Sequence, residues 1–143
     1  MTVTIGETKD RVASMVANFV GSVQLDADGA LSFPYENMRV FVNVRAWGES
    51  STVVVVFAVT NIELPPAPEL YEFVALHTDD WMFGHLVMNV VDGQAMVGFS
   101  HSLLGDRLDP EELQAAVAAV AVASNEIGNT IKGQFGGKLP SEE

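Results

Sequence analysis

The chain contains no cysteine among its 143 residues, so it forms no disulfide and offers no thiolate chemistry. Cations are also scarce: seven Lys and Arg side chains stand against nineteen Asp and Glu, which gives a formal net charge of −12. A surface of this sign repels phosphate backbones, so we expect no nucleic-acid partner. The same charge favours solubility and attracts basic or cationic segments of a partner.

A long hydrophobic run is missing as well. The stretch LQAAVAAVAVASN (113–125) is uncharged but shorter than the roughly 18 apolar residues of a membrane-spanning helix. The beginning, MTVTIGETKDRV, carries acidic residues early and has no apolar core, so it does not look like a signal peptide. We therefore expect a cytoplasmic protein without a membrane partner.

What is present is typical of a globular domain. Hydrophobic residues make up 48% and charged residues 18% of a chain whose length suits one domain. No repeat or low-complexity segment interrupts it. We expect a single domain over residues 1–137 and a disordered tail, KLPSEE, over residues 138–143.

Three segments have the periodicity of helices. The first contains an apolar stripe at helical spacing, made of Val12, Met15, Val16, Phe19 and Val20. In the middle, PELYEFVALH (68–77) begins with a proline suited to a first helical turn. The last starts with Asp109, Pro110 and Glu112, which together form a capping box. Its stretch AAVAAVAVAS (115–124) fits a helix lying flat on strands, with Val122 left over.

Strand patterns fill the remainder. The turn DADG (26–29) predicts a hairpin at a sheet edge, because Pro34 cannot donate to a ladder. In residues 37–61 we expect the loop GESS (48–51), so that Trp47 pairs with Thr52. This register sends Val53, Val55, Phe57 and Val59 to the core with Val40, Val42, Val44 and Ala46. It sends the intervening residues, Val54 and Val56 included, to the other face.

A second hairpin is centred on Asp92-Gly93, a strong two-residue turn. Pairing Val91 with Gln94 predicts a core face of Met82, Leu86, Met88 and Val90 opposite Leu103, Phe99, Val97 and Ala95. The reverse face then holds Phe83, His85, Val87 and Asn89 opposite small side chains and Met96.

The resulting order, α-β-β-β-β-α-β-β-α, predicts an α+β fold: an antiparallel sheet whose N-terminal, middle and C-terminal helices lie mainly on one face. The other face is unusually apolar for a monomer. Three explanations remain open: the middle helix or the first hairpin covers it, it is a dimer interface, or it is a groove for a partner. The candidate partner-binding or dimer residues are Arg39, Phe41, Arg45, Trp47, Val54, Val56, Phe83, His85, Val87 and Met96.

We find no catalytic, cofactor-binding or metal-binding motif. His85 and His101 point to opposite faces in the expected register, and a zinc site needs three or four converging ligands. GFSHS (98–102) lacks the second glycine of a nucleophile elbow, and GQFGG (133–137) does not follow a strand as a dinucleotide fingerprint does. We expect no cofactor.

The predicted order of elements resembles the superfamily of YbjN and type III secretion chaperones. The ending LDPEELQAAVAAVAVASNEIGNTIKGQFGG (108–137) is similar to the terminal helix of its YbjN-type, peptide-binding chaperone branch, although Asn125, Gly128 and Asn129 replace more acidic residues there. The resemblance implies a small acidic protein, often homodimeric, that binds segments of other proteins and catalyses no reaction.

The first hypothesis is therefore a non-enzymatic, chaperone-like module that dimerises and binds a segment of a partner protein through the apolar sheet face. The alternative is a small-ligand sensor or enzyme that uses a cavity between sheet and helices, with His85 or His101 as its polar group. A third hypothesis is a structural subunit whose role is assembly with one partner.

Overall fold

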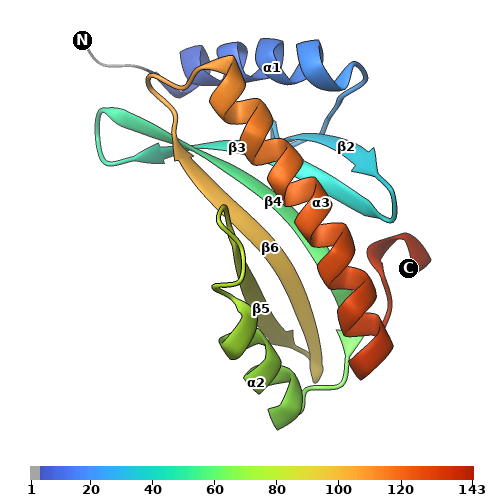
Figure 1. Ribbon diagram of the computed structural model, residues 1–143. Helices are drawn as coiled ribbons and strands as arrows, with labels where there is room; N and C mark the ends of the chain where they lie inside the picture. The colour runs from blue at the N-terminus through green and yellow to red at the C-terminus, as the bar shows by residue number, and fades with distance from the viewer. Residues whose placement is uncertain (1–3) are drawn as a thin grey trace.

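The valine-rich segments form the centre of a six-stranded antiparallel sheet in a computed structural model, which describes residues 4–143 (Figure 1). The strand order is β1-β2-β3-β4-β6-β5. Strands that follow each other in the chain are neighbours in the sheet, with one exception. The segment that carries the middle helix leads from β4 to β5, and β6 lies between these two strands. The strands are β1 (Gln24–Leu25), β2 (Leu31–Tyr35), β3 (Met38–Trp47), β4 (Ser51–Leu64), β5 (His85–Val91) and β6 (Gln94–Leu104).

Three helices lie on one side of this sheet: α1 (Ile5–Val20), α2 (Pro68–His77) and α3 (Pro110–Phe135). The predicted cap of α3 is confirmed, since the Asp109 carboxylate accepts a hydrogen bond from the Glu112 amide at 2.8 Å. Helix α3 runs diagonally across β4 and β6 (Figure 1). None of the helices described in residues 4–143 combines the length and apolar character needed to cross a bilayer.

The α+β class and the order of helices and strands are confirmed. The possibility that the middle helix or the first hairpin covers the second sheet face is wrong. The Phe73 ring of α2 packs edge-on against the Phe135 ring of α3, with centroids 5.5 Å apart, so α2 lies on the α3 side. Strands β1 and β2 extend the sheet at its edge instead of folding over it (Figure 1).

The core lies between the sheet and the helices. It is built by alternate strand residues and by one face of α3, all almost fully buried: Val40, Val42, Val54, Val56, Ala58, Val97, Phe99, Leu113, Val120 and Ile131. Two buried polar side chains also face α3. The Asn61 amide donates to the Gly128 carbonyl at 3.0 Å and accepts from the Thr60 hydroxyl at 2.8 Å, which ties β4 to the middle of α3.

The predicted register of β3 and β4 is wrong by one residue. Trp47 pairs with Ser51, across a loop of residues 48–50 in which Gly48 has a φ of 69°. The reason is tertiary: the Thr52 hydroxyl contacts that of Thr8 on α1 at 3.0 Å and donates to the Asp106 carboxylate at 2.6 Å. These bonds hold Thr52 on the helix side, so every second residue after it also faces the core.

The register of β5 and β6 is confirmed, including the Val91–Gln94 pair. Leu86 is buried and Met88 half-buried as predicted, but the placement of Val90 in the core is wrong, because this side chain near the end of the hairpin is 49% exposed. The placement of Met82 in the core is wrong, because this side chain is 89% exposed. Strand β5 begins only at His85, so residues 81–83 are not held to the alternation of the sheet.

The structure also differs from the expectation of a disordered tail at residues 138–143. The Lys138 backbone exchanges two hydrogen bonds with Ile62, and Leu139 is buried. Leu139 packs where Gly128 has no side chain: a Cβ there would lie 3.2 Å from the leucine methyl group. The short 3₁₀ helix η1 (Pro140–Glu142) ends the chain, held by Lys132 Nζ donating to the Glu142 carboxylate at 2.6 Å.

Candidate partner-binding face

One face of the sheet carries none of the helices α1, α2 and α3, and we call it the open face. Its side chains alternate with those of the core along the four long strands. It includes Arg39, Phe41, Asn43, Arg45 and Trp47 on β3, Val53, Val55, Phe57 and Val59 on β4, Met96, Gly98, Ser100 and Ser102 on β6, and His85, Val87 and Asn89 on β5.

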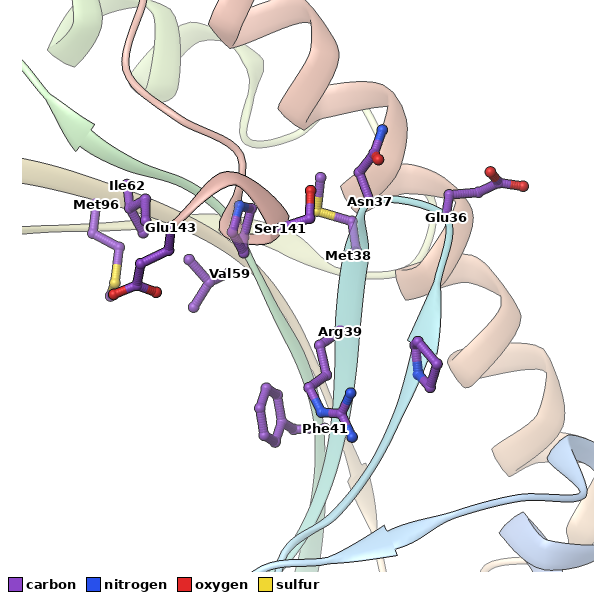
Figure 2. A pocket seen from close by; sticks show the side chains of 12 residues that line it. Glu36, Asn37, Met38, Arg39, Phe41, Val59, Ile62, Met96, Ser141 and Glu143 are labelled. Atoms are coloured by element: carbon purple, nitrogen blue, oxygen red, sulfur yellow. The ribbon is translucent and has the colours of Figure 1, made fainter.

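Two neighbouring hollows follow the open face. The first, of about 610 Å³, is lined by Arg39, Phe41, Val59 and Met96 and is closed at one end by residues of the C-terminal segment. Figure 2 shows these side chains, from three strands, around one concavity with Glu143 beside Met96. The second, of about 520 Å³, runs from Phe41 and Val59 to Arg45. Both hollows are lined by Phe41 and Val59, so they adjoin each other, and we call the two together the trough.

The shape of this trough depends on small residues in β6. Gly98 pairs with Val59 and lies beneath the Phe57 ring, where a Cβ atom would come within 2.8 Å of a ring carbon. Ser100 faces Phe57 from the same strand and lines the second hollow. Larger side chains at these positions would displace the ring, so β6 supplies depth and β3 and β4 supply the apolar walls.

The charged groups of the open face are the two arginines on β3. The Arg39 guanidinium donates to the Ser32 hydroxyl at 3.0 Å and to the Gln24 side-chain oxygen, both neutral acceptors. Arg45 is exposed at the end of the second hollow. Within residues 4–143, the side-chain ion pairs are His77–Asp80, Lys132–Glu142 and Lys138–Glu63, and none contains an arginine.

Seven of the ten candidate residues lie on the open face as the sequence predicts. They are Arg39, Phe41, Arg45, Trp47, His85, Val87 and Met96. Val54 and Val56 are not there: both are fully buried on the helix side because of the register shift. Phe83 is also misplaced, since it precedes β5 and lies near α3, with its ring 5.7 Å from that of His101.

The sequence predicts the wrong face for four residues of β4, since it places them in the core: Val53, Val55, Phe57 and Val59. Residues 53–56 are four valines in succession, so the local pattern is the same whichever alternate set faces inward. The polar residues Thr52 and Thr60 even favour the wrong register, because both are buried on the helix side.

The histidines do not form a common site. His85 is exposed on the open face, whereas His101 pairs with Val56 and lies on the helix side. Burial, with a smaller contribution from nearby His85, lowers the pKa of His101 below its ordinary value. No group of three or more His, Asp or Glu side chains converges into a possible metal site in the part of the chain that the structure describes.

A second apolar surface lies along the edge of the sheet that carries α2 and β5. Six of the eleven large apolar side chains exposed among the described residues belong to this segment. We define this α2–β5 surface by Tyr71, Leu76, Met82, Phe83 and Val90. The sixth, Val91, pairs with Gln94 and lies on the same side of β5 as Asn89, which is the side of the open face. The α2–β5 surface is separate from the trough, whose lining includes none of these residues.

A family model described as "T3SS (YopN, CesT) and YbjN peptide-binding chaperone 1" matches residues 6–143. A search of curated protein sequences gives no match. Among solved structures, the fold is similar to the ExsC–ExsE complex, with 18% identity, a TM-score of 0.62, and coverage of 85% of this chain and 93% of that chain.

Two further structures have the same fold. For YbjN from E. coli the identity is 12% and the TM-score 0.64, with 89% of this chain and 93% of that chain covered. For the Yersinia pestis type III secretion chaperone SycH, in complex with a stable fragment of YscM2, the identity is 13%, the TM-score 0.50, and the coverage 85% and 97%. At these identities the likeness establishes the fold.

Proposed function

Because this chain belongs to the family of type III secretion and YbjN peptide-binding chaperones, we propose that it is a non-enzymatic binding module that holds a segment of a partner protein on its open face. The observation that carries the proposal is the trough along Phe41, Phe57 and Val59, on a sheet face that none of α1, α2 and α3 covers.

Energetics support this assignment. Full burial of a Val, Phe or Met side chain stabilises a complex by about 1.5–3 kcal/mol. The apolar trough residues are only half-buried in the free chain, so a bound segment gains part of this free energy at each of them. Complexes of a chaperone with a polypeptide also occur among proteins of this fold, as the SycH structure with its YscM2 fragment illustrates.

The test compares two sets of valine-to-threonine substitutions, which keep side-chain shape and strand propensity while adding a hydroxyl group. The triple variant Val53→Thr, Val55→Thr, Val59→Thr makes the open face more polar, at two positions that line the trough and at the adjacent Val53. The control, Val122→Thr, makes the same change at an exposed position of α3. Partners captured by the wild-type chain are identified by mass spectrometry, and their segments are titrated by calorimetry.

We expect the triple variant to lose at least tenfold in affinity, on the order of 1.4 kcal/mol or more, while the control binds like the wild type. Circular dichroism confirms folding of each variant. Unchanged affinity in a folded triple variant would exclude the open face as the binding site.

We also propose that the protein is a homodimer, with the α2–β5 surface as the contact. Large apolar side chains gathered on one edge are unusual on a monomer, and an isologous contact would bury each of them twice. Light scattering of the wild type should give twice the mass of one chain. The substitution Leu76→Glu places a charge in the contact and should reduce the measured mass to that of one chain. A wild-type monomer at high concentration would refute this contact.

The alternative, a ligand site built on His85 or His101, has less support. The two hollows between the α2 region and α3 are lined by neither residue. Should the double variant His85→Gln, His101→Gln keep full partner affinity, as we expect, these histidines have no part in binding the segment.

A further inference from the structure

The open face differs in charge from the rest of the molecule. Of nineteen acidic residues in the chain, none is among the sixteen open-face residues named above, whereas two of the seven cations, Arg39 and Arg45, are. The acidic residues that line the first hollow are Glu36, in the turn between β2 and β3, and Glu143, which follows η1. In Figure 2 the Glu36 carboxylate points away from the other labelled side chains, whereas Glu143 lies beside Met96. The trough therefore has a cationic stretch along β3 and an acidic end beside η1.

For a ligand in contact with the sheet, the positive charges of Arg39 and Arg45 matter more than the net charge of −12 of the whole chain. At physiological ionic strength the Debye length is about 8 Å, so charges on the helix side are largely screened from the open face. Arg39 and Arg45 would instead lie directly against a bound segment. Arg39 is also pre-organised, because Ser32 and Gln24 hold its guanidinium without neutralising it.

We propose, as an extension of the proposed function, that the segment held in the trough is extended, apolar and acidic, with carboxylates that pair with Arg39 and Arg45. The two arginines are six residues apart on β3 and face the same way, so they lie about 20 Å apart at about 3.3 Å per residue. An extended segment running beside β3 matches this distance with acidic side chains six residues apart.

A second copy of the open face is a poor partner for Arg39 and Arg45. Two-fold pairing of identical faces would bring four guanidinium groups into one interface, where the sixteen open-face residues named above supply no carboxylate, and burial of unpaired charge is strongly unfavourable. The charge pattern thus favours a partner of opposite sign over self-association through this face.

Two synthetic peptides of ten residues test the proposal. Both carry the same four apolar residues and differ only at positions 2 and 8, which are Glu in one and Lys in the other. We expect the Glu peptide to bind about tenfold tighter at physiological salt, with a preference that weakens as salt rises. The double variant Arg39→Glu, Arg45→Glu should reverse the preference, and the control Lys9→Glu, on α1, should leave it unchanged.

The outcomes separate the two proposals. If both peptides bind equally, or the Lys peptide binds tighter, and the valine-to-threonine triple variant abolishes binding, the trough holds segments but the acidic preference is refuted. If neither peptide binds the wild-type chain, the trough does not hold an extended apolar segment and both proposals are refuted.

Discussion

Two neighbouring valines of β4 should respond to truncation very differently. Val56 is fully buried against the helices, and Val55 is half-buried on the open face. Val56→Ala removes two buried methyl-sized groups, worth about 1.6 kcal/mol of transfer free energy, and the cavity left behind raises the cost to about 2–3 kcal/mol. Val55→Ala leaves no closed cavity and should cost less than about 1 kcal/mol. Both lose the same strand propensity, so the comparison isolates burial.

Urea unfolding followed by circular dichroism measures both changes. With an m-value of about 2 kcal/mol/M, Val56→Ala should lower the midpoint by about 1 M and Val55→Ala by less than about 0.5 M. Binding should show the opposite order, because only Val55 lines the trough. Equal midpoints, or a larger loss for Val55→Ala, would refute the register from which the open face is defined.

Three further substitutions test the packing that positions the open face. Asp106→Asn weakens the acceptor of the Thr52 hydrogen bonds and should lower the urea midpoint at neutral pH. Hydrogen bonds from Thr52 lower the pKa of Asp106, so the stability that the carboxylate contributes is lost as pH falls through this lowered pKa. The urea midpoints of the wild type and the variant should therefore converge in acid. Asn61→Ala leaves buried polar groups unpaired and should cost about 1–3 kcal/mol, against less than about 0.5 kcal/mol for Asn89→Ala on the exposed part of β5. Leu139→Ala should cost about 2 kcal/mol and speed proteolysis of the C-terminal segment, and unchanged cleavage would refute its packing.

Local patterns were enough to predict the class and order of the fold. Each of the signals that identified these elements involves residues close together in the chain. They are the capping residues around Asp109, the helical stripe around Val12 and the Asp92-Gly93 turn, and a local pattern is enough to recognise them. The second hairpin came out in register because a two-residue turn fixes it.

The candidate site was predicted only in part, because half of it depends on contacts distant in sequence. The direction of Val53 to Val56 is set by Thr52, whose partners Thr8 and Asp106 lie 44 and 54 residues away. Similarly, the Leu139 side chain packs into the space left by the missing side chain of Gly128, and no local pattern of residues 138–143 indicates this contact. The apolar character of a second sheet face was nevertheless visible, since β3 carries Phe41 and Trp47 on its outer side whichever way β4 is registered.

Valine methyl NMR of the labelled protein tests most directly whether a partner segment lies on the open face. The protein is titrated with a segment of a captured partner, and the methyl signals are followed. Methyl signals of Val53, Val55, Val59 and Val87 should shift on binding, while those of the core residues Val40, Val54 and Val56 should stay in place. Shifts confined to core valines, or to Val90 on the other side of β5, would contradict this account.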